Sequence, residues 1–335
     1  LFITNEHLTP SVKDYLQRVN TTYHPYDGVT AFLQQAPQNE HSFLYAFNIN
    51  YAFAELISEA CIGHWTPEQG LSPITSWRAH KNEAEIAGFR RAMQHDGVAL
   101  VRFHRELDEK VADGSINQET EWSIAERLEE IRAEHPEYRG LSFATIAGYA
   151  GNGAIVHYEA TAENHAQLAD KSFLLLDSGA HYVSGTTDIT RTIPLGVLSD
   201  EEKKAYTLVL KGMIQLSMAH FPAGTTGLAL DFAARQSMWR EGYDFGHGTG
   251  HGVGSHLCVH EGPHQIRKDR RAATEVPFQV GMTVSNEPGI YVANKFGVRL
   301  ENVLVAEPAQ LTTFGEFLKF ETLTLCPFDV SPIIV

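Results

Sequence analysis

The feature that most constrains this chain is a series of acidic residues inside or beside short apolar runs. Asp177 follows the run 173–176, Asp188 opens the run 188–193, Glu287 follows 282–285, and Glu301 lies inside 298–305. Each run has the length and composition of a strand. Charged side chains are rarely buried unless they are paired or bind a metal. Four carboxylates in such positions therefore predict bound cations, and their number favours a two-metal hydrolytic site.

A glycine-rich segment adds an imidazole to this set. Residues 246–254 read Gly-His247-Gly-Thr-Gly-His251-Gly-Val-Gly. Alternating glycines would let the backbone come close to a bound ligand, although a plain glycine-rich turn is the alternative. Four carboxylates and one imidazole lack the thiolates and multiple histidines of structural zinc sites. We therefore expect two divalent ions, with Mn²⁺ as the first choice and Co²⁺ or Zn²⁺ as substitutes.

The order of these residues and their flanks resembles the pita-bread metallopeptidase family. Besides the histidine segment, the matching stretches are Leu-Asp177-Ser-Gly-Ala, Gly-Thr-Thr-Asp188-Ile-Thr-Arg-Thr, Asn286-Glu287-Pro-Gly and Arg299-Leu-Glu301-Asn. Together with Val259-His260-Glu-Gly-Pro, the histidine segment is most similar to the Xaa-Pro aminopeptidase branch. The resemblance covers roughly residues 76–325.

This resemblance implies a role for each ligand. Asp177 would bind one metal, His251 and Glu287 the other, and Asp188 and Glu301 would bridge the two. Ions held about 3.5–4 Å apart share a water and lower its pKa toward neutrality, which supplies a bridging hydroxide as the nucleophile. No Ser or Cys nucleophile is then required.

Three further histidines, His157, His247 and His260, match positions that surround the scissile bond in this family. We expect His260 to shuttle a proton and the other two to face the substrate, effects worth about 10²–10⁴ in rate. With 17 histidines in the chain, a single one is more often a surface or core residue. That simpler interpretation holds for His64, His95, His165 and His220.

Three residues beside the predicted ligands could support them or only pack nearby. Arg299 lies two positions before Glu301 and Tyr291 four after Glu287, so either could orient a carboxylate, and a packing role is as plausible. Asn286 stands where many relatives carry Asp, and strand alternation should point it away from the metals.

Composition narrows the class of protein. The formal charge of −15, from 26 basic and 41 acidic residues, argues against nucleic acid as a partner. Three widely spaced cysteines, Cys61, Cys258 and Cys326, argue against a disulfide framework. No apolar stretch of 18 residues is present, so we expect no membrane span and a cytoplasmic location.

The chain is expected to divide near residue 75. Residues 1–75 resemble part of a creatinase-like N-terminal domain, and 76–335 the catalytic domain of an α+β, pita-bread fold in which helices cover a curved antiparallel sheet. Relatives in this branch carry more chain at both ends, so we expect a fragment or processed form. Helices are predicted at 11–19, 82–111, 119–133, 200–221 and 228–241, and strands over the four acidic runs.

The expected activity is release of the N-terminal residue from peptides whose second residue is proline. Proline lacks the N–H and has a fixed φ, so peptidases that read the backbone cannot use it. One alternative is prolidase, which acts on Xaa-Pro dipeptides and must hold the proline carboxylate. The other is a catalytically silent binding module on the same fold, although such relatives usually lose ligands. A homodimer is compatible with the resemblance.

Overall fold

The computed structural model describes residues 1–35, 49–60 and 72–335. Contacts within the chain divide it into two compact units, Leu1–Ile74 and Thr75–Val335. This division falls next to the boundary expected from the sequence.

The first unit contains short helices and one small sheet. Helix α1 (Pro10–Arg18) begins at Thr9, whose side chain accepts a hydrogen bond from the Val12 amide, as an N-cap residue does. Helices α2 (Val29–Gln35) and α3 (Tyr51–Ala60) follow, and β1 (Phe2–Ile3) pairs in parallel with β2 (His24–Pro25). Cys61 and His64, named in the sequence analysis, lie outside the described residues.

The second unit is built around one long helix. After α4 (Pro73–Ala79), helix α5 (Glu83–Asp113) begins with a capping box between Asn82 and Glu85 and ends at Gly114, whose φ of 78° suits glycine. Helix α6 (Glu121–Ala133) has its own capping box, between Thr120 and Ser123. The predicted helices 82–111 and 119–133 are thus confirmed to within two residues.

Short antiparallel strands form the rest of the framework. Sheet β4-β5-β8 is central, and β3-β6-β7, β12-β15-β16-β9, β13-β14 and β10-β11 surround it. The strand bounds are β3 (Tyr138–Leu141), β4 (Ile146–Tyr149), β5 (Phe173–Ser178), β6 (Ala180–Tyr182), β7 (Gly185–Thr186), β8 (Ile189–Pro194), β9 (His220–Pro222), β10 (Gly250–His251), β11 (Gln265–Ile266), β12 (Thr283–Asn286), β13 (Gly289–Val292), β14 (Phe296–Arg299), β15 (Asn302–Thr312) and β16 (Gly315–Thr322).

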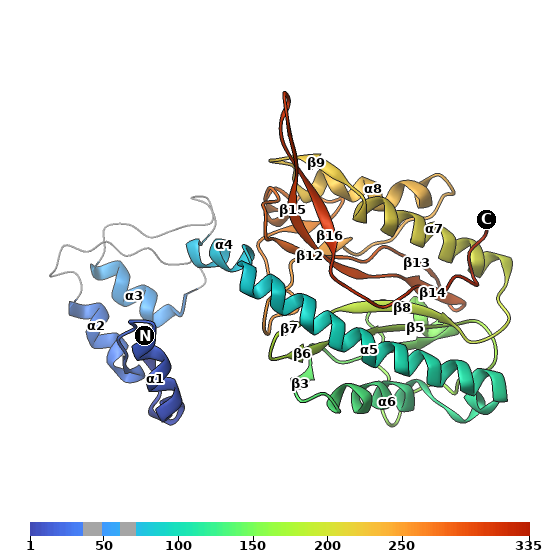
Figure 1. The fold of residues 1–335 in the computed structure, drawn as a ribbon, viewed down its shortest axis with the longest axis horizontal. Helices are drawn as coiled ribbons and strands as arrows, with labels where there is room; N and C mark the ends of the chain where they lie inside the picture. The colour runs from blue at the N-terminus through green and yellow to red at the C-terminus, as the bar shows by residue number, and fades with distance from the viewer. Residues whose placement is uncertain (36–48, 61–71) are drawn as a thin grey trace. The chain divides into compact units, whose positions relative to one another are not determined.

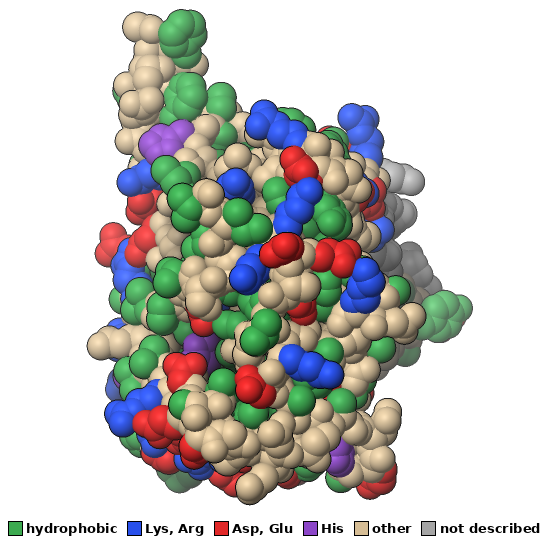
Figure 2. Space-filling view, turned by 90° about the vertical axis from the view of Figure 1, so that its right-hand side faces the viewer, with side chains coloured by type: hydrophobic (Ala, Val, Ile, Leu, Met, Phe, Trp, Pro, Cys, Tyr) green, Lys and Arg blue, Asp and Glu red, His purple; other side chains and the backbone are tan. Residues whose placement is uncertain are grey.

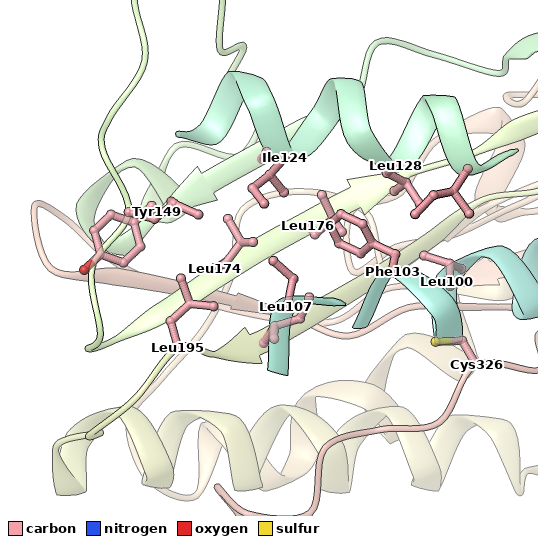
Figure 3. Close-up of a cluster of buried hydrophobic side chains, with 14 of the residues drawn as sticks. Leu100, Phe103, Leu107, Ile124, Leu128, Tyr149, Leu174, Leu176, Leu195 and Cys326 are labelled. Carbon is pink, nitrogen blue, oxygen red and sulfur yellow. The ribbon is translucent and has the colours of Figure 1, made fainter. Parts of the chain in front are cut away.

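Helices cover the strands from two sides. Helix α6 and helix α7 (Asp200–Ser217) lie on opposite sides of a layer that contains β5, β8, β13 and β14 (Figure 1). On the α6 side, Leu100, Phe103 and Leu107 of α5 and Leu128 of α6 pack against Leu176 of β5 (Figure 3). On the other side α7 packs against β13 and β14, and helix α8 (Gly227–Trp239) packs against α7. The acidic runs are therefore held between two apolar layers.

Two predicted elements differ from the structure. The helix predicted at 200–221 ends at Ser217, because Phe221 belongs to β9, where it pairs with Leu318 and packs 5.0 Å from the ring centroid of Phe320. The strand predicted at 298–305 is interrupted at Leu300–Glu301, which separates β14 from β15. That interruption frees Glu301 from strand pairing.

Two further features concern membrane-spanning helices and surface charge. No helix within the described ranges is long and apolar enough to cross a membrane. On the face seen in Figure 2, basic side chains are interspersed with acidic ones.

Candidate metal centre

The five predicted ligands come from five separate places in the second unit. Asp177 lies within β5, Asp188 directly precedes β8, His251 is in β10, Glu287 follows β12, and Glu301 occupies the break between β14 and β15. Asp177, Asp188 and Glu301 are 8%, 4% and 1% exposed. Strands β5 and β8 pair antiparallel, with Asp177 opposite Thr190. Asp188 lies two residues before Thr190 in the sequence. The strand layer thus brings distant acids together.

The ligand atoms approach one another closely. One donor atom each from Asp188, His251 and Glu301 lie within 4.8 Å of one another. His251 Nε2 is 3.4 Å from Asp188 Oδ2 and 3.6 Å from Glu287 Oε1. Although burial opposes it, the hydrogen bond with Asp188 and the charge of Glu287 raise the pKa of His251 to about 9. This imidazole is oriented by carboxylates on two sides.

Three of the four carboxyl groups have raised pKa values, because their ionised forms are buried close to one another. Burial, reinforced by neighbouring acids, raises the pKa of Glu301 well above its usual range and that of Glu287 to about 7. Burial also raises the pKa of Asp177, against the opposing charge of Arg299. Asp177 Oδ1 is buried with no hydrogen-bond partner among the described residues. An orphaned carboxylate oxygen in a cluster of hard oxygen donors fits divalent cations, which would supply the missing charge.

A second set of side chains supports this cluster. Arg299 donates from Nη2 to Asp177 at 2.6 Å and from Nη1 to the Tyr291 hydroxyl at 2.9 Å. Thr190 donates to Glu301 at 2.8 Å. Arg299 therefore contacts a predicted ligand, although it holds Asp177 rather than Glu301, whereas Tyr291 reaches Asp177 only through Arg299. Asn286 points away, donating to the Met213 carbonyl on α7, as alternation predicted.

The chain of hydrogen bonds continues into His247. Its Nδ1 lies 2.7 Å from the Gly248 carbonyl oxygen and its Nε2 lies 2.7 Å from the Tyr291 hydroxyl. A carbonyl only accepts, so Nδ1 carries the proton and Nε2 accepts from Tyr291. Burial, together with the charges of Arg299 and Arg235, lowers the pKa of His247 to about 3. His247 is thus a neutral ring with both nitrogens engaged, and Tyr291 stands between it and the acids.

His157 and His260 are exposed and line the same pocket. The His260 ring stands perpendicular to that of His251, with centroids 4.2 Å apart. His157 follows the short helix of residues 150–154, in a segment tied to Glu121 through its neighbour Tyr158, whose hydroxyl donates at 2.7 Å. Elsewhere, His95 stacks on His135 and His165 contacts a backbone carbonyl, as expected for histidines outside the site.

The pocket encloses about 480 Å³. The residues that line it include all five predicted ligands and the three predicted histidines, together with apolar Phe143, Ile146 and Val156. Two further polar residues, Gln265 and Arg267, also line it, and the sequence analysis did not single them out. They follow no ligand motif, and only the pairing of β10 with β11 brings them here.

The motif glycines have a packing role in addition to the one expected. A Cβ at Gly250 would lie 1.9 Å from the Ser285 carbonyl oxygen, and one at Gly252 would lie 2.0 Å from that of Glu261. These glycines allow backbone to pack on backbone. Gly248 and Gly250 also line the pocket, so the close approach of a ligand to this segment stays a prediction. Gly250 and Gly252 fix His251 against β12 and against the loop that carries His260.

That loop is anchored by Glu261. Lys81 Nζ, on a side chain that is 1% exposed, contacts Glu261 Oε1 at 2.7 Å, and Arg78 contacts Oε2. The Glu261 amide donates to the Gly252 carbonyl at 2.7 Å. His260 is therefore placed beside His251 by its neighbour's ion pairs rather than by its own contacts.

Comparison with known proteins agrees with this arrangement. The profile of metallopeptidase family M24 matches residues 87–308, and that of the creatinase/prolidase N-terminal domain matches residues 1–85. The chain belongs to metallopeptidase family M24. The expected α+β pita-bread fold with a preceding creatinase-type domain is confirmed.

Individual relatives are more specific. A probable Xaa-Pro aminopeptidase P of Aspergillus niger is 41% identical over 337 residues, covering 98% of this chain and 54% of that protein. A probable Xaa-Pro aminopeptidase P of Laccaria bicolor is 41% identical over 343 residues, covering 100% and 52%. The chain therefore spans about half the length of these curated relatives.

Solved structures give the same grouping. The X-prolyl aminopeptidase of Caenorhabditis elegans, a cytosolic enzyme with a di-nuclear active site, superposes with a TM-score of 0.86 at 33% identity, over 99% of this chain and 54% of that one. The Xaa-Pro dipeptidase of Bacillus anthracis superposes with a TM-score of 0.75 at 23% identity, over 100% and 86%, which shows the shared fold alone.

Proposed function

We propose that the protein containing this chain is a metal-dependent Xaa-Pro aminopeptidase. It would release the N-terminal residue from peptides with proline at the second position. The observation that carries the proposal is a single pocket lined by Asp177, Asp188, His251, Glu287 and Glu301 together with His157, His247 and His260. Family membership and relatives of that description support the same activity.

The four carboxylates and the imidazole are proposed to hold two divalent ions. Asp177 would contribute to one ion, His251 and Glu287 to the other, and Asp188 and Glu301 to both. When bound, the ions supply Lewis-acid polarisation of the scissile carbonyl and an activated water. Mn²⁺ is our first choice, because oxygen donors dominate the set.

The histidines are proposed to manage the substrate and its protons. His260, exposed and beside His251, is placed to deliver a proton to the leaving prolyl nitrogen. His157 would contact the substrate from the opposite segment of the pocket wall. His247 would also face the substrate. Its neutral ring accepts a hydrogen bond from the Tyr291 hydroxyl, which in turn accepts one from Arg299.

The decisive experiment compares substrates on the full-length protein after metal depletion and reconstitution. We expect Ala-Pro-Ala to be cleaved at least as efficiently as Ala-Pro, Ala-Ala-Ala to be a poor substrate, and Mn²⁺ to restore activity best. Elemental analysis should find close to two ions per chain. Absence of metal-dependent hydrolysis of every Xaa-Pro peptide would refute the proposal, and a strong preference for the dipeptide would indicate a prolidase.

Three minor proposals follow from the resemblance and the composition. We propose that the domain boundary lies at residues 75/76, that the protein is located in the cytoplasm, and that it forms a homodimer. Limited proteolysis, cell fractionation and analytical ultracentrifugation test these in turn.

A further inference from the structure

The pocket contains an arginine with no partner among the acids of the metal centre. Of the two arginines that line it, Arg299 is buried and committed to Asp177 and Tyr291. Arg267 is different, since among the described residues its ion pair is with Asp269, whose side chain is 42% exposed, and its own side chain is 19% exposed. A guanidinium in a pocket otherwise dominated by carboxylates needs an explanation.

The local strand geometry points Arg267 into the pocket. In β11, Ile266 is fully buried in the apolar cluster that includes Ile266, Phe278 and Met282. Gln265 alternates with Ile266 along β11 and so faces the other side, and both Gln265 and Arg267, which directly follows the strand, line the pocket. Gln265 is paired directly with the proposed ligand His251, so this face of β11 adjoins the metal centre.

Two contacts hold the guanidinium without consuming it. Asp269 accepts from Nε at 2.8 Å, and neither Nη nitrogen has a hydrogen bond among the described residues. A Cβ at Gly248 would lie 3.0 Å from Nη1 and 3.1 Å from Cγ, so the side chain lies along the backbone next to His247. The absence of a side chain at Gly248 is what gives Arg267 this path.

We propose that Arg267, assisted by Gln265, binds a carboxylate of the peptide substrate on the carboxyl side of the scissile bond. The inference rests on the proposed aminopeptidase function and specifies its substrates. A cationic substrate amine is repelled by a guanidinium, so the amino terminus belongs at the acids and the anionic part of the peptide belongs at Arg267. A planar fork of donors matches a carboxylate in geometry as well as charge.

The carboxylate has two sources, a free C-terminus or an acidic side chain after proline. Ala-Pro-Ala and its C-terminal amide differ only in the first, and the amides of Ala-Pro-Asp and Ala-Pro-Asn differ in the second. Comparing kcat and KM within each pair isolates the charge. The pair with the larger ratio identifies the source.

The chain offers a matched control for Arg267→Ala. Arg271 also pairs with Asp269, but it is exposed and does not line the pocket. If Arg267 acts on substrate, R267A should raise KM for the preferred carboxylate peptide by about ten- to hundredfold, with kcat nearly unchanged and the matching neutral peptide unaffected. R267K should recover part of the loss, and R271A should leave both peptides unchanged.

The outcomes separate this inference from the proposed function. If the metal-loaded protein cleaves Xaa-Pro peptides but R267A weakens charged and neutral peptides equally, Arg267 only stabilises its loop and the inference is overturned. If the wild-type protein cleaves none of them, the proposed function has failed, and calorimetric titration of the same peptide pairs then decides whether the carboxylate site exists. Equal affinity for both members of each pair would remove it.

Discussion

Two buried groups of carboxylates in this protein are stabilised in opposite ways. Glu121, fully buried at the start of α6, accepts hydrogen bonds from the amides of Tyr149 and Ala166, the Asn152 amide nitrogen and the Tyr158 hydroxyl, at 2.6–3.2 Å. The metal-centre acids instead face one another, with one oxygen of Asp177 unpartnered among the described residues. The protein itself supplies hydrogen-bond donors to both oxygens of Glu121. The second group is completed only by a ligand, which is the physical signature of a binding site.

The largest expected effect separates ligands from proton carriers. Glu301→Ala should abolish hydrolysis and lower the metal content, because its carboxylate is proposed to contact both ions. His260→Ala should lower kcat by about 10²–10⁴-fold while metal content stays near that of the wild type. Elemental analysis beside steady-state kinetics checks both. Equal loss of metal in the two variants would contradict the division of roles.

Glu261, like Glu121, has its partners within the protein, since it pairs with Lys81 and Arg78. It affects the site through its neighbour His260, which lines the pocket. Glu261→Gln leaves Lys81 buried without its anion and should loosen the loop that places His260. We expect kcat to fall about 10–100-fold with metal content retained, an effect typical of supporting residues around metal sites. Arg90→Gln, which removes a surface ion pair with Glu321, is the control and should leave kcat unchanged. A change in KM alone would exclude the proposed path through His260.

Neutralising one acid from each group should shift stability in opposite directions when no metal is bound. The folded pKa of Glu287 is raised to about 7 by burial first, so the metal-free protein loses stability as the pH rises from about 4.5 through 7. Glu287→Gln should therefore stabilise the metal-free protein by about 1–3 kcal/mol at pH 8, and the gain should vanish near pH 4.5.

The same replacement at Glu121 should destabilise by about 1–3 kcal/mol, because an amide cannot accept from every donor around it. Urea unfolding of both variants in the presence of a chelator measures the two signs. Destabilisation by both would mean that the metal-centre acids are satisfied within the protein.

A buried imidazole provides the smallest effect. Burial lowers the pKa of His264 to about 4, so the folded protein holds it neutral while the unfolded chain takes up a proton below about 6.5. Stability should consequently fall as the pH drops from 6.5 toward 4, by about 2 kcal/mol at pH 5 from this residue. His264→Gln, which keeps a donor for the Thr283 carbonyl, should show a smaller loss between pH 7 and pH 5. An unchanged slope would mean that other groups control acid unfolding.

Much of this architecture was predictable because burial is periodic. The apolar spacing in α5 and the runs that flank Asp177 and Asp188 reflect single buried faces, which a sequence displays directly. Phe221 was misassigned because its strand exists only through pairing with β16, almost 100 residues away. The break at Glu301 is not marked by a glycine or proline, since Leu300 and Asn302 flank it. Arg267 was overlooked because a run of charges resembles a solvated loop until β11 directs one member inward.

The spacing of the metal-centre residues along the chain governs when the site can exist. Asp177 and Glu301 are separated by almost half of the second unit, and His251 and Glu287 lie on other segments. Forming such contacts requires closing long loops, a late event in folding. No local fragment can collect an ion in advance, so the ions are captured by a nearly finished tertiary structure. Metal occupancy then serves as a record of correct folding, and a cell that supplies metal stabilises only the molecules that have already assembled.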